Sequence, residues 1–140
     1  MEKKRNVSVL IPCRIQNKQV FVYLQKREKN RKVLPDHFGF FGGKIEERET
    51  PAQALEREIQ EEMCFVPKGC EFLSKYDFID WSSNVYFLEV NDNFEKEVKI
   101  MEGEYGKFFS EKEALSEPML TDDNKDILRD LYVFLKKGNE

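Results

Sequence analysis

The sequence has few of the residues that several classes of site require. His37 is the only histidine among the 140 residues, so no histidine cluster exists to hold zinc or to act in a catalytic triad. The three cysteines, Cys13, Cys64 and Cys70, are an odd set without metal-ligand spacing, and each stands beside apolar residues. Their pattern predicts buried free thiols in a reducing compartment rather than a disulfide framework.

Long hydrophobic runs and an excess of positive charge are also missing. The apolar stretch that begins at Val7 ends at Pro12 and Arg14, too short and too polar for a signal peptide or a membrane span. We therefore expect a cytoplasmic protein with no membrane partner. The 23 basic and 27 acidic residues give a net charge of −4, which predicts no stable nucleic-acid partner but permits a local basic pocket for phosphates.

What the chain does contain is the composition of one folded domain. Hydrophobic residues make up 40% and charged residues 36%, as in globular proteins, and the length suits a single domain over residues 1–140. Alternating or apolar stretches predict strands at 7–11, 20–24, 71–79 and 84–90. Residues 16–18 suit the turn of a first hairpin, residues 80–84 read as a second turn, and residues 91–106 form a long charged loop.

Three helices are predicted from capping residues and apolar spacing. Thr50 suits an N-cap, with Pro51 at the first helical position and Gln53 completing a capping box. Ser110 with Glu113 repeats that signal ahead of a short helix. The apolar stripes fall at Ala52, Leu55, Ile59 and Met63 in the first helix, and at Ile127, Leu128, Leu131, Phe134 and Leu135 in the last.

The first helix carries three acidic residues on neighbouring turns. Glu58, Glu61 and Glu62 stand at i, i+3 and i+4, so their carboxylates share an arc, where like charges repel by a few tenths of a kcal/mol per pair. One interpretation is a solvated acidic face. The other is a site for a hard divalent cation, because Mg²⁺ prefers a few carboxylates together with phosphate oxygens and water.

The wider spacing favours the second interpretation. The segment from Gly43 to Phe65 resembles the signature of the Nudix hydrolases, G-x5-E-x7-R-E-U-x-E-E-x-G-U, where U is a bulky apolar residue. The matching positions are Gly43, Glu49, Arg57, Glu58, Ile59, Glu61, Glu62 and Phe65. Cys64 stands where the family has Gly, so the helix either ends in a left-handed cap at a cost of about 1 kcal/mol or ends in another way.

The resemblance implies an α/β fold, with a mixed, curved sheet between helices as in the α/β/α Nudix sandwich. It also implies hydrolysis of a substituted diphosphate by water, assisted by Mg²⁺ or Mn²⁺. The residues that it implies as metal ligands are Gly43 through its carbonyl, Glu58, Glu61, Glu62 and Glu102. Glu102 is expected as general base or further ligand, with Glu104 as its alternate and Glu58 as the competing base, while Glu49 and Arg57 pair to brace the loop against the helix.

Substrate contacts are also expected from the resemblance. Arg27 is a candidate for the phosphates, and Phe41 is expected either in the core or in the wall of the pocket. Asp123 and Asn124 either cap the last helix or offer hydrogen bonds to a purine edge, and Trp81 either stacks on a base or packs at the end of a strand. The chain looks most like the mutator-type nucleoside triphosphate pyrophosphohydrolases, as a monomer or homodimer, and oxidised purines are typical substrates of that group. The alternatives are an RNA 5′ pyrophosphohydrolase, a nucleotide-sugar hydrolase, and a non-catalytic Nudix module that senses a nucleotide or binds a partner.

Overall fold

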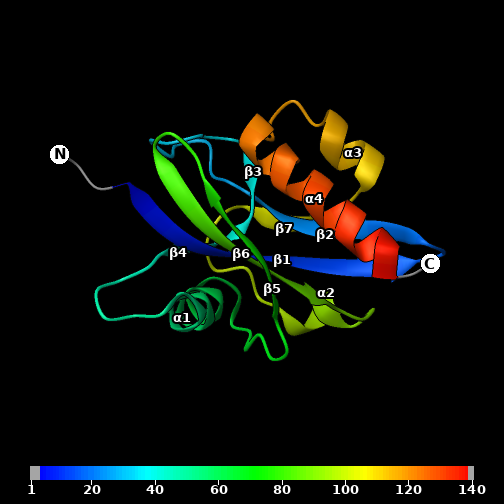
Figure 1. Cartoon of the computed structure of the whole chain (residues 1–140), viewed down its shortest axis with the longest axis horizontal. Helices are drawn as coiled ribbons and strands as arrows, with labels where there is room; N and C mark the ends of the chain where they lie inside the picture. The colour runs from blue at the N-terminus through cyan, green and yellow to red at the C-terminus, as the bar shows by residue number, and fades with distance from the viewer. Residues whose placement is uncertain (1–3, 139–140) are drawn as a thin grey trace.

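The computed structural model describes residues 4–138 and consists of one mixed sheet with helices on both faces (Figure 1). The outermost residues of the predicted domain, 1–3 and 139–140, lie outside the described part. The strands are β1 (Arg5–Gln16), β2 (Gln19–Lys26), β3 (Phe38–Gly39), β4 (Phe41–Lys44), β5 (Glu71–Asp77), β6 (Trp81–Glu89) and β7 (Tyr105–Ser110). Their order is β3-β2-β1-β6-β5, with β4 paired to β1 and β7 paired to β2. Only the β1–β6 pairing is parallel among those described.

The helices form two layers around this sheet. Helix α1 (Pro51–Met63) lies on one side, and α3 (Glu111–Ser116) with α4 (Asp122–Gly138) covers the other, as Figure 1 shows. A short helix, α2 (Phe94–Glu97), follows β6. The predicted α/β/α sandwich is therefore confirmed. None of the helices in residues 4–138 is long and apolar enough to cross a membrane.

Strand β1 runs through the middle of the sheet and supplies both cores. Val7, Val9 and Ile11 belong to the cluster that includes α4, whereas Leu10 belongs to the cluster that includes α1. This alternation follows from the two-residue period of a strand, whose successive side chains point to opposite faces. Because both faces are covered, β1 reads as an almost continuous buried run.

The local signals of the helix ends are confirmed. Thr50 and Gln53 form a reciprocal capping box at the start of α1, and Ser110 and Glu113 form another at the start of α3. Helix α1 ends at Cys64 with φ 49° and ψ 42°, and the Cys64 N–H donates to the Gln60 carbonyl. Of the two predicted endings, the structure has the left-handed cap.

Several boundaries and burial predictions are wrong. Residues 81–83 are the start of β6 and not a turn, because they pair in parallel with the start of β1, and Ser82 and Ser83 are buried there. The predicted loop 91–106 contains α2, whose Phe94 is buried, and its last two residues begin β7. Ala52 and Phe134 face solvent. The α1 core uses Ala54 instead, and α4 buries Tyr132 instead.

The cysteines also differ from the prediction. All three are free thiols, as predicted, but only Cys13 is buried, while Cys70 is partly exposed and Cys64 is exposed. Burial raises the pKa of the Cys13 thiol to about 12 and that of Cys70 to about 11. Cys64 is exposed because it follows the last turn of α1, beyond the face that packs on the sheet.

Candidate active site

The centre of the site is a carboxylate buried between α1 and β4. Glu62 is only 4% exposed, and its Oε2 accepts a hydrogen bond of 2.7 Å from the Gly42 N–H. Gly42 has φ +139°, and a Cβ there would stand 2.1 Å from the Ser8 carbonyl oxygen, so only glycine fits. The acidic arc of α1 is therefore not a solvated face at this position.

The carboxylates of Glu58 and Glu102 affect the ionisation of Glu62. Burial raises the pKa of the Glu62 carboxyl to about 8, and the negative charges of Glu102 and Glu58 add to that increase. The Gly42 N–H and the positive charge of Arg31 act in the opposite direction. The ionised Glu62 carboxylate lowers the stability of the fold, because desolvation and the neighbouring negative charges both disfavour its charged form.

Gly43 allows Glu58 to approach the loop backbone. A Cβ at position 43 would stand 2.6 Å from Glu58 Oε2, inside the closest contact that real side chains make. The Gly43 position therefore admits only a residue without a side chain while Glu58 keeps this pose. The resemblance expects the Gly43 carbonyl and the Glu58 carboxylate at one metal, and the structure places the two residues next to each other.

Arg57 connects the loop before α1 to the acidic arc. Its Nε and Nη2 donate to the two carboxylate oxygens of Glu49 at 2.7 and 2.9 Å, and Nη2 also donates to the Lys44 carbonyl at 3.0 Å. Its Nη1 donates to Glu58 Oε1 at 2.8 Å and lies 3.7 Å from Glu61 Oε2. The Arg57 hydrogen bonds, together with the Glu46 N–H, lower the pKa of Glu49 to about 2. The predicted Glu49–Arg57 pair is thus present as a two-bond bridge.

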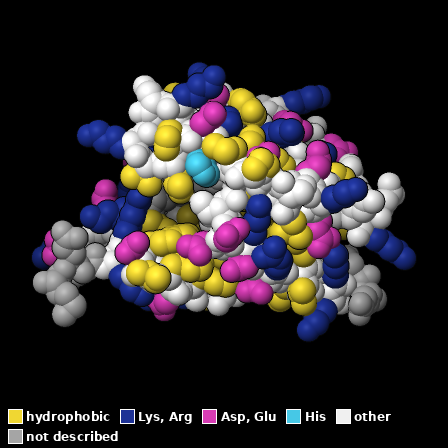
Figure 2. Space-filling view, turned by 90° about the horizontal axis from the view of Figure 1, so that it is seen from above, with side chains coloured by type: hydrophobic (Ala, Val, Ile, Leu, Met, Phe, Trp, Pro, Cys, Tyr) yellow, Lys and Arg dark blue, Asp and Glu magenta, His cyan; other side chains and the backbone are white. Residues whose placement is uncertain are grey.

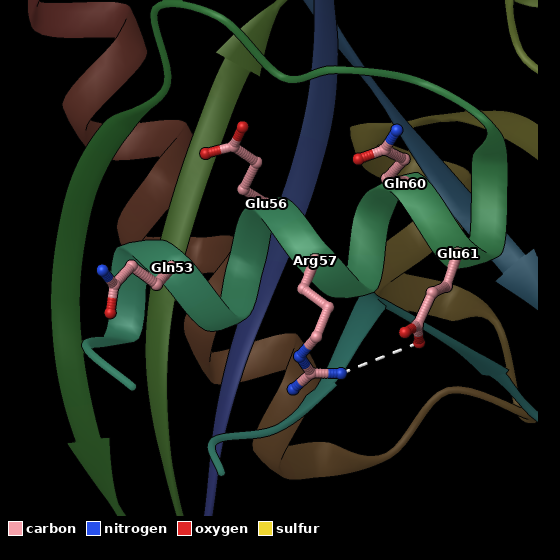
Figure 3. A pocket seen from close by; sticks show the side chains of 5 residues that line it. All are labelled: Gln53, Glu56, Arg57, Gln60 and Glu61. Atoms are coloured by element: carbon pink, nitrogen blue, oxygen red, sulfur yellow. Dashed lines mark ion pairs between the residues drawn. The ribbon is translucent and has the colours of Figure 1, made fainter. Parts of the chain in front are cut away.

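Figure 3 shows how Arg57 and Glu61 lie on the outer surface of α1. Both side chains point to the same side of the helix, whereas Glu56 points the opposite way. A shallow depression of about 450 Å³ is lined by Gln53, Glu56, Arg57, Gln60 and Glu61. Glu61 is the most accessible of the three acidic residues of the arc, because its side chain is 57% exposed compared with 16% for Glu58.

The loop before β7 brings Glu102 to the arc. The Met101 N–H donates to the Glu62 carbonyl at 2.7 Å, and Gln25 Nε2 donates to the Glu102 carbonyl at 3.0 Å. Gly103 follows with φ +81°, where a Cβ would stand 2.7 Å from the Lys26 carbonyl oxygen.

These contacts separate the two predicted alternatives in this loop. The Glu102 charge acts on Glu62, whereas the Glu104 charge acts on Lys26. The buried Gln25 that holds the loop in place was not predicted. Its only signal was a polar residue directly after the apolar run of β2.

The donor set fits a divalent cation. Every side chain that the resemblance implies as a ligand offers carboxylate oxygen, which Mg²⁺ and Mn²⁺ prefer. Burial, and after it the negative charges of Glu102 and Glu58, raises the pKa of Glu62, and a bound cation would favour the ionised form of that carboxylate. Within residues 4–138 no three acidic, histidine or cysteine side chains already stand together as a closed ligand set, and Arg57 holds Glu58 and Glu61 in this structure.

Arg27 lies close to the same centre and retains an unused donor. Its Nη2 donates to the Val33 carbonyl at 3.1 Å, but its buried Nε has no acceptor among the described residues. Burial lowers the pKa of Arg27, as do the positive charges of Arg31 and Arg5, while the Glu62 charge raises it. The guanidinium groups of Arg27 and Arg31 therefore both act on the buried carboxylate, and this local positive charge suits an anionic ligand.

The start of α4 holds the other candidate contacts. Thr121 Oγ1 accepts a hydrogen bond from the Asn124 N–H at 3.2 Å, so Thr121 caps the helix and Asn124 is not needed for that role. Asn124 Oδ1 is buried and has no donor within the described part of the chain. Asp123 Oδ2 accepts a hydrogen bond of 3.3 Å from Trp81 Nε1, which attaches the Trp81 indole at the start of β6 to the first turn of α4.

Of the two roles expected for Phe41, core residue and pocket-wall residue, the structure shows the core one. Phe41 is fully buried in the cluster that includes α1, where its ring stacks on Tyr23 with centroids 5.6 Å apart. The cause is the register of β4, which pairs Phe41 with Leu10 of β1. The neighbouring Phe40 packs against the opposite core and stays partly exposed, as alternation along the chain requires.

Figure 2 shows the face that carries His37, the single cyan side chain. The surface is hollowed beside it, with hydrophobic side chains lining the hollow and acidic ones along one edge. The His37 carbonyl accepts a hydrogen bond from the Arg27 N–H at 2.8 Å, so this hollow lies beside the segment that carries Arg27.

Comparison with known proteins gives a consistent result. The family model described as the NUDIX domain matches residues 3–131. The 8-oxo-dGTP diphosphatase of Escherichia coli K12 is 33% identical over 110 residues, which cover 77% of this chain and 81% of that protein. The 8-oxo-dGTP diphosphatase of Proteus vulgaris is also 33% identical, over 97 residues, which cover 65% of this chain and 80% of that protein.

Solved structures share the fold at lower identity. A mutT/nudix family protein from Listeria innocua superposes with a TM-score of 0.77 at 19% identity, covering 99% of this chain and 98% of that chain. The NUDIX domain of Shewanella oneidensis NrtR, complexed with ADP ribose, has a TM-score of 0.75 at 19% identity and covers 96% of this chain and 90% of that chain.

Proposed function

The chain belongs to the NUDIX domain family, and from this premise we propose that it hydrolyses an oxidised purine nucleoside triphosphate to the nucleoside monophosphate and pyrophosphate. The two 8-oxo-dGTP diphosphatases at 33% identity support this substrate class. The observation that carries the proposal is the burial of Glu62. The negative charges of Glu58 and Glu102 act on its carboxyl group, which in turn acts on Arg27.

Enzymes of this family work with a divalent cation, and we propose Mg²⁺ or Mn²⁺ for this chain. Such an ion, when bound, neutralises the diphosphate and lowers the pKa of a coordinated water. Its ligands would come from the Gly43 carbonyl and from the carboxylates of Glu58, Glu61, Glu62 and Glu102. Arg57 would position Glu58 and Glu61 through the contacts described above.

The protein's own residues would accept a proton and bind the phosphates during the hydrolysis. A water oxygen attacks the α- or the β-phosphorus, and the bond from that phosphorus to the oxygen that bridges the two breaks. Attack at the α-phosphorus expels pyrophosphate with the bridging oxygen, whereas attack at the β-phosphorus expels the nucleoside monophosphate with that oxygen and leaves the attacking oxygen in pyrophosphate. Glu102 accepts the proton of the attacking water, or Glu58 does so in its place. Arg27, with its unused Nε donor, binds the phosphate oxygens.

Asn124 supplies a reason for selecting an oxidised base. Guanine presents N7 as an acceptor, whereas 8-oxoguanine carries a hydrogen on N7 and donates from that position. A buried acceptor without a donor costs about 1–3 kcal/mol, and an N7–H would satisfy Asn124 Oδ1 whereas an N7 acceptor would not. A site with such a group discriminates through hydrogen bonding rather than through size.

The test is a substrate panel of 8-oxo-dGTP, the ordinary nucleoside triphosphates, ADP-ribose, a nucleotide sugar and a 5′-triphosphorylated RNA. Phosphate release after coupling to pyrophosphatase gives kcat/KM for each substrate, and chromatography identifies the products.

We expect 8-oxo-dGTP to be preferred, and we expect Asn124→Ala to reduce that preference about tenfold. Asn91→Ala, at an exposed amide after β6, is the matched control. Equal hydrolysis of dGTP and 8-oxo-dGTP by the native chain would refute the substrate assignment, and ADP-ribose or RNA as best substrate would replace it.

A further inference from the structure

Three aromatic rings form a stack beside the connection between β5 and β6. The rings of Tyr76 and Phe78 lie nearly parallel, with centroids 6.3 Å apart and 8° between planes. Those of Phe78 and Trp81 lie 4.7 Å apart at 25°. The sequence predicted Tyr76 and Phe78 at the end of one strand and Trp81 in the turn after it, and nothing in their spacing predicts a shared role.

Both ends of the stack bond to α4. Trp81 Nε1 donates to Asp123 Oδ2 at 3.3 Å, and the Tyr76 hydroxyl donates to Asp130 Oδ2 at 2.7 Å. The two aspartates are seven residues apart, which is about two turns or roughly 10.5 Å along the helix. Two attachments at that spacing fix both the position of the first half of α4 and its rotation about its own axis. The stack of Tyr76, Phe78 and Trp81 with these two hydrogen bonds is called the aromatic clamp below.

The attachment at Trp81 lies one residue from Asn124. Asn124 is held at the backbone by Thr121, and its buried Oδ1 is unused within the described residues. Rotation of the first turn of α4 would move Asp123 and Asn124 together, because consecutive helical residues share one rigid backbone. One face of the Trp81 ring is packed on Phe78, which matches packing at a strand end.

We propose that the aromatic clamp is a specificity device, in which Trp81 acts as a positioning residue that holds Asp123 and thereby sets the orientation of Asn124 toward the base. This rests on the proposed function only in that α4 faces the base of the substrate. Trp81 takes no part in the chemistry at phosphorus, so its loss changes how well one base is told from another and leaves turnover at saturation unchanged. A merely structural role would lower stability without changing base preference.

The experiment measures kcat and KM for the full substrate panel with native protein, Trp81→Phe, Asp123→Ala and the double variant. Trp81→Phe keeps an aromatic ring beside Phe78 and removes the N–H together with part of the indole. We expect each single variant to reduce the kcat/KM ratio between the preferred base and the others about three- to tenfold, through KM. The double variant should lose no more than either single variant, because both remove the same bond.

Asp123→Asn, which keeps an oxygen acceptor for the indole, should restore most of the ratio. Tyr86→Phe is the matched control, since it removes a hydroxyl from the same strand on the opposite face of the sheet, beside the cluster that includes α1. Unfolding midpoints of all variants show whether each is folded. The readout is the preference for whichever base the native protein selects, so it does not depend on that base being oxidised.

The outcomes separate the two proposals. If Asn124→Ala reduces base preference and Trp81→Phe does not, the aromatic clamp proposal is wrong and the proposed function stands. If the panel shows that another purine is preferred, and Trp81→Phe still reduces that preference, the clamp stands and the substrate assignment falls. Additive losses in the double variant, or a native protein that discriminates no base at all, would overturn the clamp.

Discussion

The two long helices lie on opposite faces of the sheet and use acidic residues in opposite ways. Helix α4 has Asp122 and Asp123 in its first turn and Lys136 and Lys137 in its last, so its charges complement the helix dipole. Helix α1 has no acidic residue in its first turn and no basic residue in its last. Its acidic arc lies in the second half, with one carboxylate buried.

This difference between α4 and α1 separates acidic residues that stabilise the fold from those that need a functional explanation. The aspartates at the start of α4 contribute to stability through helix polarity, and Asp123 also accepts the indole N–H. Glu62 reduces stability by its burial and by the like charges around it, because each disfavours the ionised form. Selection for stability would not place a carboxylate at position 62. The proposed hydrolysis explains its presence, because Glu62 would bind the cation.

The largest expected effect is the loss of hydrolysis in Glu62→Gln. The amide keeps an acceptor for the Gly42 N–H but loses the charge that would bind a cation. Groups that only support metal ligands cost 10- to 100-fold when removed, so a ligand itself should cost at least about 100-fold in kcat/KM, measured at modest Mg²⁺ concentration. Glu61→Gln should behave in the same way. Turnover near that of the native protein by Glu62→Gln at saturating substrate would overturn the metal assignment.

The same substitution should have the opposite effect on stability. The folded pKa of about 8 exceeds the ordinary value of 4.5, so the metal-free folded state binds the extra proton, and its stability falls as pH rises from about 4.5 to about 8. Glu62→Gln removes that dependence and should raise the metal-free unfolding midpoint at pH 8. Asp122→Asn in α4 is the matched control, where we expect a loss of a few tenths of a kcal/mol and unchanged activity.

A smaller effect is expected in the loop that reaches α1. Glu102→Gln should lower kcat at least about tenfold with little change in the unfolding midpoint, because the amide can no longer accept the proton of the attacking water. Glu104→Gln should lower kcat less, because the Glu104 charge acts on Lys26. A larger loss in Glu104→Gln would reverse the roles of the two residues. No loss in either would leave Glu58 as the base.

The smallest effect concerns the end of α1. Cys64 has φ 49°, in a region that favours glycine, so Cys64→Gly should raise the free energy of unfolding by about 1 kcal/mol. Cys64→Ala keeps the unfavourable φ and serves as the control, with little expected change. Chemical denaturation measures both. A lower midpoint for Cys64→Gly would mean that the entropy of the unfolded chain outweighs the relief of strain.

Local signals predicted the parts of the fold that depend on neighbouring residues. The capping boxes at Thr50 and Ser110 lie where they were predicted, because a cap needs only a side chain and the backbone three residues away. The prediction of a turn at the start of β6 is wrong, because it rested on the polar residues Ser82 and Ser83. Their burial depends on β1, more than 70 residues earlier in the chain, where Asn6 accepts the Ser82 hydroxyl.

The sequence by itself determined the acidic arc, since one helix with fixed spacing places Glu58, Glu61 and Glu62 on adjacent turns. The tertiary structure decided which of them is buried, because that depends on how α1 meets Gly42 of β4. It also decided that Phe41 lies in the core and that the charge of Glu102, and not that of Glu104, raises the pKa of Glu62. Trp81 bonds to Asp123 for the same reason, since strand register and helix packing bring together residues that no local pattern relates.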